Sequence, residues 1–194
     1  LGGLVSQTLI DGLLVSNAAR RDFLLASIPG TFGASSALPV VNGLPETTES
    51  TTEIAGTADA GASFGVLVGG EPADYDPVTG QWTIPDAALF PGENNVLVQA
   101  LGEDGQEVDR LRILIRYNNG VMNPVGPMSG FTTTTLTAEG GPWLLGPGTT
   151  FMGKDATLVI EPGATVYFPP DSLLRVRDRS TITAIGTDLH RIQF

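Results

Sequence analysis

The sequence predicts a mainly β protein in three parts: an N-terminal helical segment, a sandwich of short antiparallel strands, and a stack of parallel coils. Three patterns indicate this. Apolar residues recur at spacings of three and four near the N-terminus, and five short runs suited to strands follow in the middle. In the last quarter, four apolar pairs recur every eight residues and a fifth follows ten residues on.

Residues 1–29 carry the helical pattern, and Pro29 with Gly30 ends it. An amphipathic helix has to bury its apolar stripe, so we interpret this segment as the end of a preceding domain or as a docking helix. The stripe comprises Leu9, Ile10, Leu13, Leu14, Ala18, Leu24, Leu25 and Ile28.

Residues 30–46 are rich in Gly, Ser and Pro and are expected to form a linker. Residues 47–118 follow with five short runs suited to strands, separated by turns. Leu111 and Ile113 alternate with arginines in the last run, which is typical of a strand with one buried face. Several short strands with regular turns predict an immunoglobulin-like β-sandwich. The runs are residues 54–58, 64–68, 81–84, 95–100 and 111–117.

Residues 119–131 are expected to be a second linker, and residues 132–194 an incomplete parallel β-helix. A pair spaced i, i+2 places both side chains on one face of a strand. Steps of eight residues suit a strand plus a bend, and about three steps would complete a coil. Residues 153–194 would then form about one and a half coils, with the lower rung uncovered. The pairs are Leu158/Ile160, Val166/Phe168, Leu174/Val176, Ile182/Ala184 and Ile192/Phe194.

Three stretches of the chain resemble families of large secreted bacterial proteins. "ATLVIEPGATVYF", "LLRVRDRSTITAIGT" and "HRIQF" look like the opening coils of right-handed parallel β-helix domains, although Asp178-Arg179 stands where members commonly carry Gly. The stretch from "IAGTADAG" to "GEDGQEV" resembles bacterial immunoglobulin-like modules, which are usually spacers. "SNAARRDFLLASIP" is similar to the final helix of spore-coat-kinase-like domains. The resemblance implies a fold of helix, immunoglobulin-like sandwich and β-helix, with any kinase-like site upstream of this chain.

The composition of the chain argues against several classes of partner and of functional site. The net charge of −11 argues against nucleic acid as a partner, because phosphate binding needs clustered Lys and Arg. There is no cysteine, so disulfides, thiol catalysis and Cys-based zinc sites are excluded. No run approaches the ~20 apolar residues of a membrane span. An acidic, Thr- and Gly-rich chain fits a bacterial exported protein, so we expect an extracellular or cell-surface location. We interpret the sequence as an internal piece of a longer protein or a processed product.

The uncovered rung is the expected site of action. Unpaired strand edges and apolar side chains favour stacking, either on the remainder of the same polypeptide or on another protein subunit. We therefore expect a non-catalytic structural or adhesive segment. The expected assembly edge comprises Leu174, Val176, Ile182, Ile192 and Phe194.

Catalytic, metal and cofactor sites are not expected. Glycoside chemistry needs two facing carboxylates, but the acids of the last quarter fall at corners and turns. His190 is the single histidine and lies in a turn, without a nucleophile elbow elsewhere. Asp74 and Asp76 are weak candidates for calcium, since they flank a turn without EF-hand spacing. The acids at corners are Glu161, Asp171, Asp178 and Asp188.

An alternative function is part of a carbohydrate-active enzyme, with the β-helix face contacting acidic polysaccharide. Alternation places Arg175, Arg177 and Arg179 on the outward face of one strand, where they would form a glycan-binding strip. A solvated charged face is the ordinary alternative.

Overall fold

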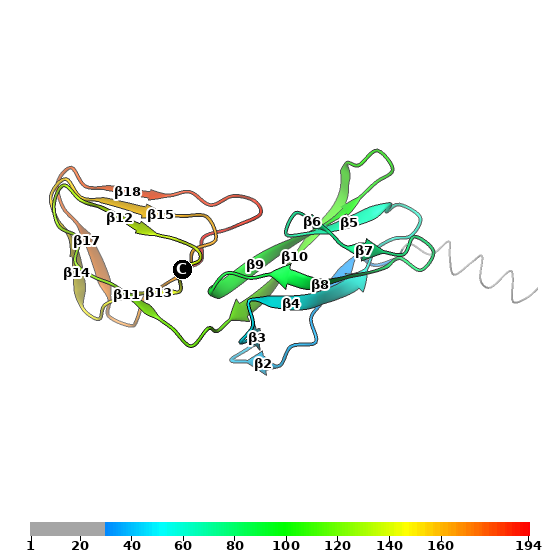
Figure 1. Ribbon diagram of the computed structural model, residues 1–194. Coiled ribbons are helices and arrows are strands. Elements are labelled where there is room, and N and C mark those ends of the chain that lie inside the picture. The colour runs from blue at the N-terminus through cyan, green and yellow to red at the C-terminus, as the bar shows by residue number, and fades with distance from the viewer. Residues whose placement is uncertain (1–29) are drawn as a thin grey trace, which may run out of the picture.

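The computed structural model describes residues 30–194, and every regular element in this range is a β-strand (Figure 1). The prediction of a mainly β protein is therefore confirmed. The helix expected within residues 1–29 lies outside the described residues. The strands form five sheets in two groups, which we call the two-sheet unit (residues 30–118) and the coil stack (residues 123–194).

The two-sheet unit contains one sheet of four strands, in the order β1-β4-β8-β7, and one of six, in the order β2-β3-β10-β9-β5-β6. All neighbouring strands are antiparallel except β3 and β10, which are parallel. The strands are β1 (Gly33–Ser35), β2 (Val40–Val41), β3 (Leu44–Thr47), β4 (Thr51–Thr57), β5 (Gly65–Val68), β6 (Glu71–Pro72), β7 (Asp74–Tyr75), β8 (Gln81–Ala88), β9 (Gly92–Leu101) and β10 (Glu107–Tyr117).

The core of this unit lies between its two sheets. Ile54 and Trp82 come from the four-stranded sheet, and Val98 and Ile115 come from the six-stranded one. In β10 the predicted alternation holds, because its apolar residues pack on this core. The arginines of β10 therefore lie on the outer face of the six-stranded sheet, where they are free to meet the coil stack.

The coil stack is built from three parallel sheets that the chain visits in rotation. Thr133, Thr157 and Thr181 lie side by side although 24 residues separate each from the next, which is three of the eight-residue steps seen in the sequence. The sheets are β11-β13-β16, β14-β17 and β12-β15-β18. The strands are β11 (Asn123–Val125), β12 (Thr133–Leu136), β13 (Trp143–Leu145), β14 (Thr149–Met152), β15 (Thr157–Ile160), β16 (Val166–Tyr167), β17 (Leu173–Val176) and β18 (Thr181–Ala184).

Both segments expected to be linkers contain strands. Residues 30–46 include β1, β2 and most of β3. β1 belongs to the four-stranded sheet of the two-sheet unit, and β2 and β3 belong to the six-stranded sheet. Residues 119–131 include β11, and Met128 bridges to Met152. The coil stack therefore begins near residue 123, earlier than the expected residue 132. Gly, Pro and Asn in these segments hid the strands, since such residues ordinarily mark turns.

Three coils are consequently present. The first contains β11 and β12, the second β13 to β15, and the third β16 to β18. Inward side chains of the first two coils, together with Ala164 and Val166 of the third, form a second apolar core. This core includes Val125, Met128, Leu136, Leu145, Met152, Leu158 and Ile160.

Leu158 and Ile182 can show how much burial under a neighbouring coil contributes to the free energy of unfolding, because they are register partners in adjacent coils. Leu158 is 2% exposed and Ile182 is 42% exposed. Leu158→Ala should lower the free energy of unfolding by about 2–5 kcal/mol through loss of burial and a cavity. Ile182→Ala should cost less than about half of that, because part of its surface already meets water. Urea unfolding measures both, and equal costs would show that Ile182 is also fully buried in solution.

Candidate functional site

The third coil leaves its apolar face uncovered along β17 and β18, whereas Val166 of β16 is 2% exposed. Val176 is 46% exposed, whereas its register partner Met152 in the second coil is 0% exposed. Ile182 and Leu158 differ in the same way. Since the partners share register and apolar character, cover by a neighbouring coil is what distinguishes them. We call this uncovered face the open end.

Residues 192–194 run along one side of the open end. Gln193 bridges to Thr165, with Val166 N–H donating to its carbonyl at 2.9 Å. Ile192 packs against the coil core, while Phe194 is 70% exposed and its ring lies 6.2 Å from that of Phe168. The structure thus places the residues expected as an assembly edge in the third coil and in the segment that follows it. They are Leu174, Val176, Ile182, Ile192 and Phe194.

The opposite end of the stack differs. Val125, Met128 and Leu136 belong to the first coil, yet all three are buried. Within residues 30–194 the stack therefore has one closed end and one open end, which gives it a direction.

Thr165 joins the coil stack to the two-sheet unit. It precedes β16, is 1% exposed, and its Oγ1 accepts from the Glu93 amide at 2.9 Å and donates to the Glu93 carbonyl at 3.3 Å. Gly92 permits this approach, because a Cβ there would lie 2.5 Å from the Thr165 hydroxyl oxygen. Arg116 on β10, the strand beside β9, donates to the Glu93 carboxylate at 3.2 Å. A buried hydroxyl of the coil stack therefore bonds both backbone groups of one residue in the two-sheet unit.

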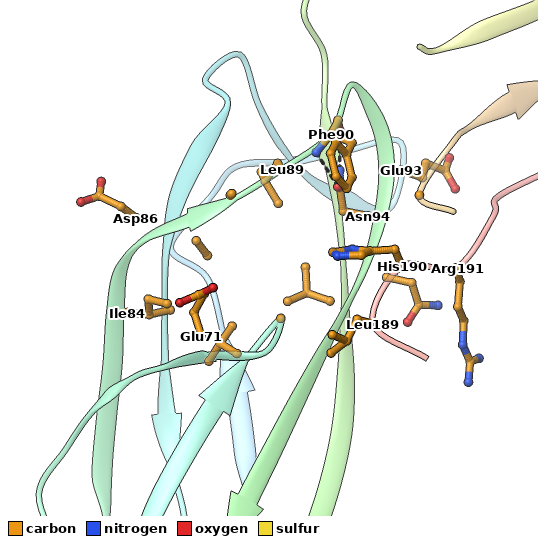
Figure 2. A pocket seen from close by; sticks show the side chains of 17 residues that line it. Glu71, Ile84, Asp86, Leu89, Phe90, Glu93, Asn94, Leu189, His190 and Arg191 are labelled. Atoms are coloured by element: carbon orange, nitrogen blue, oxygen red, sulfur yellow. Dashed lines mark hydrogen bonds between the residues drawn. The ribbon is translucent and has the colours of Figure 1, made fainter. Parts of the chain in front are cut away.

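The loop of residues 186–191 makes a second contact with the two-sheet unit. Asp188 accepts from Arg110 at 2.9 Å and from Arg112 at 2.6 Å, so the outer face of β10 binds the loop. The His190 ring meets the Phe90 ring edge-on at 5.4 Å (Figure 2). Partial loss of water raises the pKa of Asp188, but the hydrogen bond from Arg110 and the nearby arginine charges outweigh it. The pKa of this carboxyl therefore lies below its ordinary value.

A pocket of about 270 Å³ lies at this junction (Figure 2). Its walls come from both units and combine apolar side chains such as Ile84 and Leu89 with the acids Glu71 and Glu93. Among residues 30–194 no three His, Asp or Glu side chains lie close enough together to hold a metal ion. The pocket is a gap between docked units rather than a set of converging ligands.

The three arginines of the expected glycan strip have different neighbours. Arg179 donates to both carboxylate oxygens of Asp155. Arg177 lies over the Phe151 ring, 5.3 Å from its centre, and Arg175 is exposed beside Phe151 in the register. Arg179 is therefore occupied within the chain, and the strip reduces to two arginines and an aromatic ring.

The calcium candidates lie at an ordinary turn. Asp76 accepts from the Val78 amide at 2.8 Å and from the Thr79 hydroxyl at 2.7 Å. The Thr79 hydroxyl bond first, and then the Val78 amide bond, lower the pKa of Asp76. Asp74 lies in edge strand β7. These bonds account for an aspartate at this turn without an ion.

The other acids and His190 are dispersed. Asp188 is committed to the arginines of β10, and Asp171 lies at a corner with φ of +63°. His190 contacts Phe90. Glu161 and Asp178 follow β15 and β17 at corners.

Sequence reasoning did not find Thr165, Gly92 or Phe90, which make the junction. Thr165 sits outward beside the inward Val166, where a threonine ordinarily meets solvent. Gly92 follows Pro91 in what resembles any turn. No local pattern marks either residue, because the contact joins segments far apart in the sequence: Glu93 and Thr165 are separated by 72 residues.

Comparison with known proteins adds no relative: no family model, curated protein or solved structure matches the chain. Residues 30–194 contain no helix long and apolar enough to cross a membrane.

Thr165→Val should break the junction while preserving shape. The buried Glu93 amide would lose its acceptor, which costs about 1–3 kcal/mol. We expect lower stability in urea and faster hydrogen exchange at the Glu93 amide. Thr150→Val is the matched control, since Thr150 is buried in the same stack and its hydroxyl has no hydrogen bond within residues 30–194. Equal behaviour of the two variants would show that Thr165 does not hold the units together.

Asp188→Asn tests the ion pairs of the loop. The folded-state pKa of Asp188 is lowered, so its contribution is present above about pH 4 and is lost as pH falls through that folded-state value. We expect a small decrease in Tm near neutral pH, which shrinks with added salt and disappears at acid pH. Thermal unfolding of Asp178→Asn, an exposed aspartate of the same coil, is the control. A decrease in Tm that persists in acid would contradict an ionic role.

Proposed function

We propose that this chain is a non-catalytic structural or adhesive segment of a secreted or cell-surface bacterial protein. In this proposal residues 47–118 are the immunoglobulin-like sandwich and the coil stack is the start of a right-handed parallel β-helix. The first spaces neighbouring domains, and the second stacks through its open end into a larger chain or assembly. The acidic composition rich in Thr and Gly supports an exported protein.

One observation carries the proposal: two inward residues of β14 and β15 are buried, whereas their register partners in β17 and β18 are exposed. Met152 and Leu158 are covered by the third coil, whereas Val176 and Ile182 meet solvent. Exposed contiguous apolar surface next to unpaired strand edges is typical of interaction sites. An assembly surface accounts for it, and a catalytic site does not.

The junction supports a spacing role. The Thr165 hydroxyl and the Asp188 carboxylate bind two different strands of the six-stranded sheet, and Phe90 meets His190 between them. Two separated contacts resist rotation better than a single flexible linker does. The two-sheet unit therefore holds the open end in a set direction.

Binding of acidic polysaccharide is a second candidate. Arg177 lies over Phe151, which is 38% exposed, and Arg175 is next to it. A guanidinium pairs with carboxylates and an aromatic ring packs on sugar faces, so this patch has suitable chemistry. Binding of polygalacturonate that is lost on combining Arg175→Ala with Arg177→Ala would favour this candidate.

The open end should bind an apolar fluorescent dye in the isolated chain. Addition of 1-anilinonaphthalene-8-sulfonate is expected to give fluorescence that Val176→Glu and Ile182→Glu abolish, because charge removes the apolar contact surface. Val108→Glu is the matched control, since Val108 is an exposed valine on β10 of the two-sheet unit. Fluorescence should survive in this control.

Dye binding, sedimentation and hydrogen exchange together can contradict the proposed assembly role. If the chain binds no dye, sediments as a monomer and protects β18 as strongly as β15, the third coil needs no partner. The proposed assembly role would then be wrong.

A further inference from the structure

We infer that the open end accepts one kind of occupant, a further parallel coil in the register of the first three, and not a second copy of this chain. This inference rests on the proposed assembly role and specifies its partner. The partner supplies strands parallel to β17 and β18, with apolar side chains directed inward.

The fourth coil has already begun on one side. Gln193 lies beside Thr165, its amide donates to the Ala164 carbonyl at 3.0 Å, and Phe194 follows in line with Val166. That side therefore extends β11-β13-β16 by one more rung. Within residues 30–194, β17 and β18 have no strand on their outer edges.

The second coil shows what fits such a face. Its inward Leu145, Met152 and Leu158 are 2%, 0% and 2% exposed beneath the third coil. Met152 and Leu158 have Val176 and Ile182 as register partners in the third coil, and these are also apolar and similar in size. A surface that repeats the face of the second coil is complementary to the same cover, a parallel coil offset by one rung.

A second copy of the chain does not provide that cover. Head-to-tail stacking would need an uncovered first coil, but Val125, Met128 and Leu136 are buried. End-to-end stacking about a two-fold axis would set the strands of the two copies antiparallel, because the rotation reverses the sense of the coil. The existing rungs of all three sheets are parallel.

A copy of the chain's own second coil can serve as the further coil in a test. Phe194 is in line with Val166, and Val166 is the register partner of Trp143, so residue 144 is the next in register after Phe194. Appending a copy of residues 144–160 directly after Phe194 places copies of β14 and β15 beside β17 and β18. We expect amide exchange in β17 and β18 to slow by about tenfold or more, and dye binding to move to the new end.

A control chain carries Met152→Asn and Leu158→Asn within the appended copy only. It should leave exchange in β17 and β18 as in the unextended chain, because the inward contacts are lost. Equal exchange in the extended and control chains would overturn the inference. A stable dimer of the unextended chain that protects β17 and β18 would also overturn it, while leaving the assembly role intact. Absence of dye binding in the unextended chain would instead contradict the assembly role itself.

Discussion

At the open end of the coil stack, β17 and β18 leave inward side chains exposed because no further strand of residues 30–194 lies beside them. This constraint follows from the small cross-section of a three-sided coil, which places a few side chains in each layer and relies on the next layer to exclude water. Met152 and Val176 show the effect directly, since they are register partners with opposite exposure. The direction of the stack, its apolar core and its open end all depend on this constraint.

The two-sheet unit buries its apolar core between its own sheets, and the outer face of its six-stranded sheet binds the coil stack. The alternation of β10 turns Ile115 inward and leaves Arg110 and Arg112 outside, where they bind Asp188. The loop that carries Asp188 lies between β18 and Gln193, within the part of the stack that ends in the open face. Ion pairs on one unit therefore help to set the orientation of the apolar surface on the other. The inferred partner coil would meet an end that is held in place.

Local patterns predicted much of the coil stack. The i, i+2 pairs fall in β15, β17 and β18, and their eight-residue steps match the 24-residue offset between rungs. Strand β11 was missed because Asn123 and Pro124 ordinarily mark a turn, and only pairing with β13 makes them a strand. Alternation alone did not show that Asp155, 24 residues earlier, binds Arg179 of the expected glycan strip.

By itself the sequence determined the β class of the chain, the inward faces of its strands and the apolar character of the third coil, because these depend on alternation between near neighbours. The tertiary structure decided which of those faces is covered. Ile182 and Leu158 carry equivalent patterns, and only their stacking neighbours distinguish a core residue from a surface one. The same holds for Thr165, which is a buried connector because Gly92 brings a strand 72 residues away close enough to bond it. Burial is a property of neighbours in space, and the local pattern of a sequence does not record them.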